Sequence, residues 1–382
     1  MTIPETTVPR LPWSAADPYP YYERRRRDGD VVWDGAAGAW LVLGYQPARA
    51  ILGGAGWTSV PPANSMGPQL DPDLLRRNML TADGADHHRL RGSVRDVFTR
   101  TFIAGLEEGI EAIAAETVDV IPAGVTFDFM ADVALPLPIA VAASWLGLSV
   151  ESARLLREES PAISRLLGDP GDPAVVETGM AALATLLTEL LPLAADRRRH
   201  PGDDLLSFIG ADPDLELDDV VVTAVIIAVA GHETTANLLG AAMIRLFGPG
   251  GGIVETVDGG LITEMLRLDG PVQAVGRTAT TDHLFDDVTI PAGAPALVVI
   301  AAANRDPAVF DRPEEFRQER TGAAPLTFGY GAHYCLGAAL ARLEIGIALR
   351  HVLARRPALC GQPTWRDTPA IRGPLTVPTV FG

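Results

Sequence analysis

A long apolar stretch at residues 217–247, LDDVVVTAVIIAVAGHETTANLLGAAMIRLF, restricts the fold more than any other feature of the chain. Apolar residues surround the middle of the helix that this stretch predicts, which is typical of a helix running through a protein core. Asp218 or Asp219 is expected to begin the helix, and the following GPGGG to end it. A chain organised around such a helix is expected to be mainly α.

Helical patterns also dominate the first half of the chain. Residues 31–45, VVWDGAAGAWLVLGY, predict a hairpin, because two apolar runs flank a glycine-containing turn. The pattern from 85 to about 199 is helical, with interruptions expected at Pro136, Pro138, Pro161 and a GDPGDP turn.

The last third of the chain mixes short elements. A short helix is predicted at about 260–268, followed by strand segments such as ALVVIAAA, a proline-rich coil at 305–325 and a final strand-like stretch. Neither a repeat nor a flexible linker divides the chain. We therefore expect one domain over residues 1–382.

The composition argues against several classes of protein. The net charge of −17 argues against nucleic acid as the main partner, because phosphate binding relies on clustered cations. Two cysteines, Cys335 and Cys360, cannot build a disulfide framework, and the start MTIPETTVPRLPWS lacks a secretory signal pattern. The apolar stretch 220–231 is too short to cross a bilayer, and 133–148 contains two prolines. We expect a cytoplasmic monomer without a membrane span.

Cys335 lies in an unusual local sequence, FGYGAHYCLG at 328–337, directly before a helical pattern. A buried structural cysteine is the ordinary interpretation, but the glycines indicate a tight loop that approaches something closely, and a helix start favours a thiolate. Zinc would need further ligands, and only His333 is nearby. A nucleophilic cysteine would need a base, which His333 could supply. A single thiolate in a glycine-rich loop suits axial ligation of haem iron.

The same residues resemble a family signature. FGYGAHYCLG is similar to the motif F-G-x-G-x-H-x-C-x-G of the cytochrome P450 family, whose cysteine thiolate ligates haem iron. The likeness is greatest to the soluble bacterial, actinobacterial-type members. Further segments resemble the family in its order and spacing: DHHRLR at 86–91, AGHETT at 230–235, EMLR at 264–267, PVQAVGRTAT at 271–280, IPAG at 290–293 and AANRDP at 302–307.

The resemblance implies a mainly α, single-domain fold, a triangular helical prism with small β-sheets. It implies a haem-thiolate monooxygenase that activates O2 to hydroxylate or oxidatively couple a hydrophobic small molecule in secondary-metabolite biosynthesis. The cofactor is expected to be noncovalent haem b, iron protoporphyrin IX, since the chain has no C-x-x-C-H motif. Ferredoxin and ferredoxin reductase are the expected electron donors, because no G-x-G-x-x-G follows a predicted strand. The alternative is a non-catalytic haem-thiolate sensor or ligand-binding protein.

The resemblance also assigns the residues that hold the cofactor. Cys335 would be the axial ligand of the iron. His87 and Arg91, four apart on one helical face, match the pair that binds the haem propionates, and His88 fits the pattern H-x-R-L-R less well. Gly84 and Ala85 replace two prolines usual in the family. The complete expected set is His87, Arg91, Gly231, Arg277, Phe328, His333, Cys335 and Gly337.

Glu233 and Thr234 are the expected catalytic pair. The segment GHETT is similar to the start of the zinc-protease motif H-E-x-x-H, but position 236 is alanine, so that interpretation fails. These polar residues interrupt the most apolar helix of the chain, where a carboxylate without a purpose is rare. By resemblance, the helix opens beside the haem at Gly231, and Glu233 and Thr234 guide protons to the bound oxygen.

Glu264 and Arg267 lie three apart on one face of the short helix, where an ion pair can form. The resemblance makes this pair buried and structural. The family usually adds an arginine where this chain has Glu315, and Arg317 or Arg320 are the two residues that could replace it.

The substrate pocket is expected to be mostly apolar. By resemblance it includes the loop at 55–70. The expected pocket residues are Ile226, Ile227, Ala230, Val272, Ala274, Val275 and Ile371.

A different surface, beneath the cysteine, is expected to receive the electron donor. Its basic patch would consist of Arg89, Arg95 and Arg342.

Overall fold

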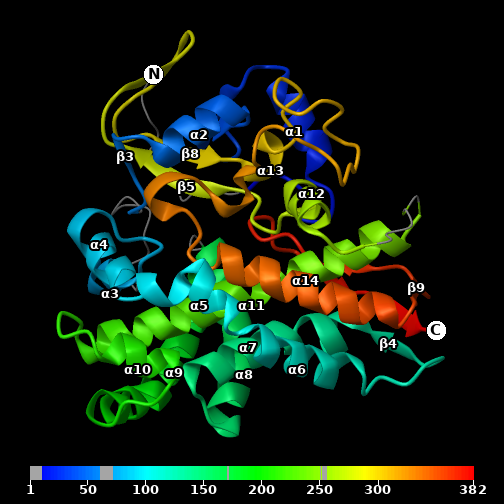
Figure 1. Ribbon diagram of the computed structural model, residues 1–382. Helices are drawn as coiled ribbons and strands as arrows, with labels where there is room; N and C mark the ends of the chain where they lie inside the picture. The colour runs from blue at the N-terminus through cyan, green and yellow to red at the C-terminus, as the bar shows by residue number, and fades with distance from the viewer. Residues whose placement is uncertain (1–10, 61–71, 170–171, 250, 252–255) are drawn as a thin grey trace.

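A computed structural model describes residues 11–60, 72–169, 172–249, 251 and 256–382. Helices form most of the molecule, and the mainly α prediction is confirmed (Figure 1). The helices are α1 (Tyr19–Arg26), α2 (Tyr45–Gly53), α3 (Pro72–Arg77), α4 (Gly84–Gly92), α5 (Arg100–Ala104), α6 (Glu107–Val118), α7 (Pro136–Leu146), α8 (Val150–Gly168), α9 (Pro173–Arg199), α10 (Leu205–Gly210), α11 (Leu217–Phe247), α12 (Gly259–Asp269), α13 (Ile300–Ala303) and α14 (Ala338–Ala354).

The central helix is α11, as the sequence predicts. It begins slightly earlier than expected, because Glu216 is the N-cap residue and forms a reciprocal capping box with Asp219. It contacts α7, α8, α9 and α14. Two helices of the described ranges, α9 and α11, are long and apolar enough to cross a membrane, but 78% of the apolar window of α11 is buried within the protein. That burial makes α11 a core helix.

Prolines affect the helices less than the sequence indicates. Pro136 and Pro138 lie in the first turn of α7, where backbone N–H groups have no intrahelical acceptor anyway. The expected interruption at Pro161 is wrong, because α8 continues through it. One lost backbone hydrogen bond is tolerated there, since Leu156 and Ile163 of the same helix are buried in a cluster shared with α9.

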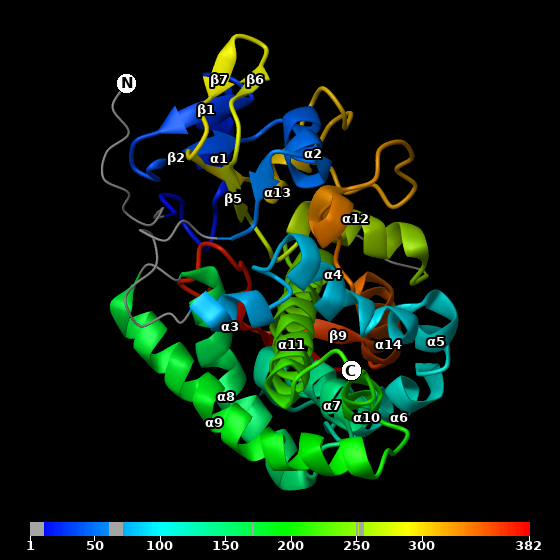
Figure 2. The same ribbon diagram turned by 90° about the vertical axis from the view of Figure 1, so that its left-hand side faces the viewer.

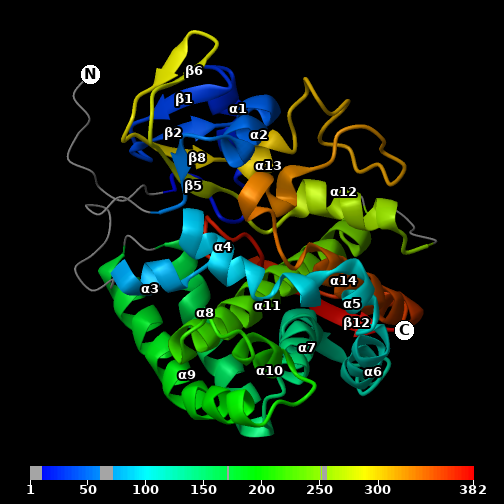
Figure 3. The same ribbon diagram turned by 60° about the vertical axis from the view of Figure 1, so that its left-hand side comes forward.

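Two of the small sheets, the five-stranded sheet and the β6-β7 pair, lie at the opposite side of the molecule from α6–α10 (Figures 1 and 3). The largest has the order β1-β2-β8-β5-β3, with only β2 and β8 parallel. The expected hairpin is confirmed as β1 and β2, with Trp33 opposite Trp40. The strands are β1 (Val31–Asp34), β2 (Ala39–Val42), β3 (Trp57–Thr58), β4 (Thr126–Asp128), β5 (Val275–Ala279), β6 (His283–Phe285), β7 (Val288–Ile290), β8 (Pro295–Val298), β9 (Pro357–Leu359), β10 (Thr364–Trp365), β11 (Pro374–Thr376) and β12 (Pro378–Phe381).

The segment ALVVIAAA is only partly a strand. β8 ends at Val298, and Val299 caps the short helix α13. Ile300 and the three alanines after it are buried, and alanine is the strongest helix former. The turn lets the chain leave the sheet and run toward the cysteine loop.

The functional region lies where these layers meet. In Figure 2, α11 runs through the centre, with α8 and α9 along the outer edge and the main sheet above. The loop that carries Cys335 enters from the sheet side and leads directly into α14, which packs on α11. The fold thus brings the cysteine loop to the middle of the longest helix.

Candidate functional site

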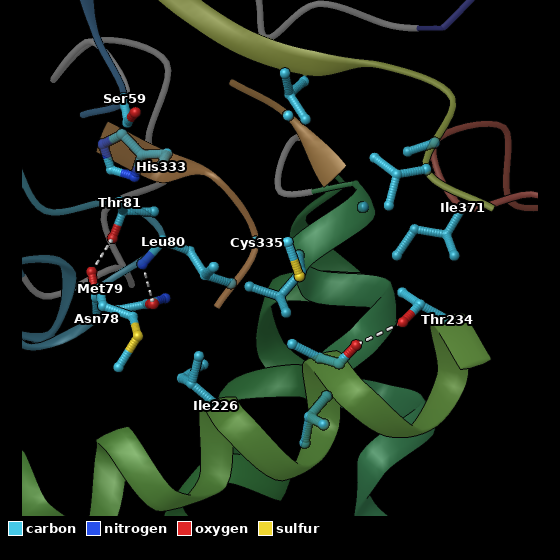
Figure 4. A pocket seen from close by; sticks show the side chains of 18 of the residues that line it. Ser59, Asn78, Met79, Leu80, Thr81, Ile226, Thr234, His333, Cys335 and Ile371 are labelled. Atoms are coloured by element: carbon cyan, nitrogen blue, oxygen red, sulfur yellow. Dashed lines mark hydrogen bonds between the residues drawn. The ribbon is translucent and has the colours of Figure 1, made fainter. Parts of the chain in front are cut away.

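A cavity of about 650 Å³ separates α11 from the cysteine loop (Figure 4). Cys335 opens on it from one side and Thr234 from the other. Polar residues such as Asn78 and Thr81 line another part of its wall. All of the expected pocket residues line this cavity: Ile226, Ile227, Ala230, Val272, Ala274, Val275 and Ile371. Most of the expected loop lies outside the described residues, since 61–71 are not described.

The cysteine loop is shaped by glycines. Gly329 and Gly331 have φ angles of +73° and +78°, which side-chain-bearing residues rarely adopt. A Cβ at Gly331 would lie 2.7 Å from the Gly53 Cα, so only glycine fits against α2. The Cys335 N–H donates to the Phe328 carbonyl at 2.8 Å and closes the loop. This backbone path presents the Cys335 side chain to the cavity.

The Cys335 thiol is exposed only in the sense that it faces the cavity. Burial raises its pKa, against the smaller effects of a hydrogen bond from the Gly337 N–H and of the nearby Arg91. The start of α14 therefore does not stabilise the thiolate enough to offset burial, contrary to the expectation from the sequence. A metal cation deprotonates a coordinating thiol outright. Iron bound at this sulfur would therefore supply the positive charge that stabilises the thiolate.

Four cationic or ionisable nitrogen groups gather beside the cavity. The rings of His87 and His333 are 4.2 Å apart, and Arg91 donates to the Tyr334 carbonyl. Arg277 donates only to the adjacent Gly276 carbonyl, at 2.7 Å, within the part of the chain that is described. These groups come from α4, β5 and the cysteine loop.

His87 carries the clearest sign of an unmet partner. It is 3% exposed, and its Nε2 has no hydrogen-bond partner among the described residues. Burial, with the positive charges of His333 and Arg91, lowers its pKa to about 4. His88 is exposed, which favours His87 as the residue that faces the site.

One carboxylate, Asp83, balances this group in the described ranges. Its Oδ1 lies 2.8 Å from the His333 Nε2, and its Oδ2 accepts from Thr58 and the Ser59 N–H. Sequence reasoning missed Asp83, although it stands only three residues before the DHHRLR segment, at the N-cap of α4. The nitrogen groups of His87, Arg91 and Arg277 remain to bind an anionic ligand such as a pair of carboxylates. The residues present therefore fit a haem with its propionates.

The turn of α11 that contains Gly231, Glu233 and Thr234 is continuous α-helix. Gly231 faces the cavity, and a Cβ there would meet nothing within 4 Å, so the expected opening consists of an absent side chain and not of broken helix. The Thr234 hydroxyl donates to the Ala230 carbonyl at 2.7 Å. Thr234 therefore presents a hydroxyl at the cavity wall without interrupting the helix.

Glu233 lies beside Thr234 but points elsewhere. Its side chain is buried, and its Oε1 accepts from the Arg366 Nη1 at 3.2 Å. Burial raises the pKa of this carboxyl, while the Arg366 charge and a hydrogen bond from Ser164 oppose the rise. Arg366 was not predicted, because it lies far away in the sequence and in no recognised motif.

Glu264 and Arg267 form the expected buried pair. Arg267 donates to both Glu264 oxygens, at 2.8 and 2.7 Å, and to the carbonyls of Asn304 and Pro313. Both residues are 2% exposed. The pair ties α12 to the coil before the cysteine loop.

Arg320 takes the place of the usual third residue. Its Nε donates to the Glu264 Oε1 at 2.9 Å, whereas the Arg317 guanidinium pairs with Asp311 at the surface. The Glu315 side chain is exposed, and only its carbonyl joins the cluster, accepting from Arg267 and Arg320. Of the two candidates, Arg317 and Arg320, it is therefore Arg320 whose side chain joins the buried pair.

The expected basic patch for an electron donor stays a prediction. Arg89 pairs with Asp219 at 2.7 Å, and Arg342 donates to the Thr263 hydroxyl. Arg95 is exposed. Neighbouring acceptors thus hold two of these guanidiniums.

Known proteins resemble this chain over nearly its whole length. The family model for cytochrome P450 matches residues 260–356. The chain is 35% identical to the cytochrome P450 monooxygenase PikC of Streptomyces venezuelae, over 95% of this chain and 91% of that protein. It is 32% identical to the erythromycin C-12 hydroxylase of Saccharopolyspora erythraea, over 86% of this chain and 85% of the relative.

The fold also matches that of a solved cytochrome P450 structure. The crystal structure of P450BioI in complex with acyl carrier protein ligated to hexadec-9Z-enoic acid matches with a TM-score of 0.89 at 26% identity, covering 96% of this chain and 99% of that one. A cysteine that faces α11 across a cavity, with cationic groups at its edge, is the arrangement that the sequence resemblance implied. This chain therefore belongs to the cytochrome P450 family and is a haem-thiolate monooxygenase of the bacterial type.

Proposed function

We propose that this protein holds haem b by the Cys335 thiolate and oxidises a hydrophobic or amphipathic small molecule in secondary-metabolite biosynthesis. The observation that carries the proposal is the shared cavity, with the Cys335 sulfur on one wall and Thr234 of α11 on the other. Bound haem with a thiolate ligand supplies oxygen activation and the insertion of oxygen into, or oxidative coupling at, a C–H bond.

The chain's own residues hold and orient the cofactor. His87, Arg91, Arg277 and His333 bind the propionates, because they bring nitrogen groups together beside one cavity with a single nearby carboxylate in the described ranges. Phe328 and Gly337 line the same cavity next to the thiolate. The role of Gly231 is to leave space at the face of α11.

Glu233 and Thr234 handle protons. The Thr234 hydroxyl can rotate from the Ala230 carbonyl toward the cavity, since a hydroxyl both donates and accepts. Glu233 is adjacent on the chain, and burial raises its pKa, which makes this carboxyl a better proton carrier than an exposed one. Proton transfer through this pair, instead of from open solvent, keeps the cavity largely water-free.

The wall composition indicates the class of substrate. Apolar residues, including those of α11 and of the segment before β5, form most of the lining, and Asn78 and Thr81 add a polar side. Such a wall suits a largely apolar molecule that carries a few hydroxyl or carbonyl groups. A polyketide, terpenoid or small cyclic peptide fits, and one relative is named for hydroxylating erythromycin.

Residues 1–382 are proposed to form one haem domain, present in the cytoplasm as a monomer. Ferredoxin and a ferredoxin reductase supply its electrons, and O2 is the co-substrate. The family relation supports external redox partners and O2 in general terms.

Two spectra test the proposal. The reduced protein exposed to carbon monoxide should show the strongly red-shifted Soret band of thiolate-bound haem, and Cys360→Ser should keep it. Cys335→Ser should lose this band. An imidazole-type spectrum in folded wild-type protein would contradict Cys335 ligation. Titrating a panel of secondary metabolites into the ferric protein should then reveal the substrate class through a spin-state shift, and no response from any apolar member would contradict the proposed pocket.

A further inference from the structure

Glu233 has one cationic partner within the described part of the chain, and that partner comes from near the C-terminus. The Arg366 Nη1 lies 3.2 Å from the Glu233 Oε1, with side-chain exposures of 18% and 7%. The Arg366 Nε is buried and has no hydrogen-bond partner among the residues that the structure describes. The guanidinium is therefore held inside the protein mainly by this carboxylate.

Arg366 belongs to a loop, residues 366–373, that joins β10 to β11 and lies against α11. The Arg366 N–H donates to the Gly373 carbonyl at 3.1 Å and closes the loop at its base. A Cβ at Gly373 would lie 2.1 Å from the side chain of Asn237, one helical turn after Glu233. The loop thus contacts one face of α11 at two successive turns.

The far part of the same loop forms a wall of the cavity. Ala370 and Ile371 line it, and Ile371 forms a β-bridge with Val272. The Gln273 N–H donates to the Ala370 carbonyl at 2.9 Å. These contacts hold the loop on its side opposite α11. The position of Arg366 is therefore set by packing contacts on both sides of the loop.

Among the charged groups around Glu233, Arg366 has the largest effect on its pKa. Burial favours the protonated carboxyl, and the Arg366 charge and the Ser164 hydroxyl of α8 oppose it. His232 is the adjacent ionisable group on α11. Burial, together with the smaller effects of Arg366 and Arg157, lowers the pKa of His232 to about 4, so it is neutral near pH 7. Arg366 is thus the charged group that acts on Glu233 directly.

We propose that Arg366 is a positioning residue that holds the Glu233 carboxylate turned toward the 366–373 loop and controls when it takes up a proton for Thr234. This inference rests on the proposed proton role of Glu233. Arg366 itself does not line the cavity. It acts only through Glu233, by fixing the direction and the charge of that side chain.

Infrared titration of the haem-loaded protein tests the electrostatic part without turnover. The band of the protonated carboxyl that is missing in Glu233→Gln is followed against pH. In Arg366→Gln the proton affinity of Glu233 should rise about tenfold, one pH unit at the midpoint, and Arg366→Lys should restore it to within about threefold. The control is Arg372→Gln, from the same loop, whose arginine faces Asp269 at 3.8 Å. An unchanged midpoint in Arg366→Gln, or an equal shift in Arg372→Gln, would overturn the inference.

Coupled turnover tests the functional part, with the panel compound that gives the largest ferric spin-state shift. Arg366→Gln should lower the share of reduced cofactor that ends in product, and Arg366→Lys should recover most of it. If Glu233→Gln loses product while Arg366→Gln matches the wild type, the inference fails and the proposed function stands. If Glu233→Gln itself matches the wild type, the proposed proton role fails.

Discussion

Arg320 and Arg267 donate to the same oxygen of the buried Glu264, at 2.9 and 2.7 Å. Burial alone would raise the pKa of Glu264, but the two guanidiniums lower it overall. Because Arg320 comes from the coil before the cysteine loop, this shared carboxylate fixes that coil to α12.

Arg320→Gln should therefore destabilise the protein by about 2 kcal/mol, the usual size of a buried hydrogen bond to a charged group. Thermal unfolding of the haem-loaded protein measures the change. The lowered pKa of Glu264 means that the pair stabilises the fold above the ordinary carboxyl range and that this stability is lost as the pH falls through it. The difference between Arg320→Gln and wild type should thus shrink in acid.

Arg317→Gln is the matched control for that prediction. Arg317 pairs with Asp311, whose side chain is 77% exposed, and surface pairs contribute little to stability. Its substitution should change stability by less than about 0.5 kcal/mol. Equal losses in the two variants would refute the assignment of Arg320 to the buried cluster.

His87→Ala should weaken haem retention. In the proposed haem site the buried Nε2 of His87, which has no partner among the described residues, would donate to a propionate, and a hydrogen bond to a charged group contributes about 1.5 to 3 kcal/mol. Haem transfer to an excess of acceptor protein should accelerate by about tenfold or more. His88→Ala removes an exposed neighbour on the same helix, and haem loss at the same rate from both variants would argue against the propionate role.

Glu344→Gln should stabilise the protein in a pH-dependent way. Glu344 is 4% exposed on α14, and burial raises its pKa to about 8. The folded protein therefore binds this proton more tightly than the unfolded chain, and wild-type stability falls as the pH rises from the ordinary carboxyl range toward 8. Glutamine has no such proton.

The advantage of Glu344→Gln over wild type should grow by about 1 kcal/mol per pH unit between pH 6 and 8. Denaturant unfolding at several pH values measures it. Glu177→Gln, at an exposed position of α9, should show a flat difference across the same range. A flat difference for Glu344→Gln as well would mean that Glu344 is ionised in the folded protein.

Local sequence was enough to predict the central helix, the first hairpin and the cysteine loop. The apolar period of 217–247 and the glycines around Cys335 act within a few residues, so they are readable before folding. The outcome at Pro161 and the turn after Val298 depended on packing partners from other parts of the chain, which no local pattern records.

The partners of the site were less predictable for the same reason. Arg366 reaches Glu233 from a separate loop, and Asp83 reaches His333 from α4's N-terminal side. The choice between Arg317 and Arg320 depended on which guanidinium the coil directs inward. Each case is decided by a side-chain direction set by tertiary contacts.

Thr234→Val tests whether the threonine hydroxyl delivers protons. Valine keeps the volume of the side chain but cannot donate or accept, so haem binding and the apolar cavity should be retained. The variant should still consume reduced cofactor, with more of it ending as hydrogen peroxide and less as product. A fall of about one to two orders of magnitude in product yield corresponds to roughly 1.4 to 2.8 kcal/mol between the two fates.

Thr234→Ser supplies the control for that experiment, because it keeps the hydroxyl that donates to the Ala230 carbonyl at 2.7 Å. Serine should recover most of the product yield if the hydroxyl is what matters, since only a methyl group is lost. The ratio of peroxide to product, measured with the same compound at equal cofactor consumption, separates this chemistry from a loss of substrate binding. Wild-type coupling in Thr234→Val would show that protons arrive by another donor, such as a substrate hydroxyl, and Thr234 would then be a wall residue only.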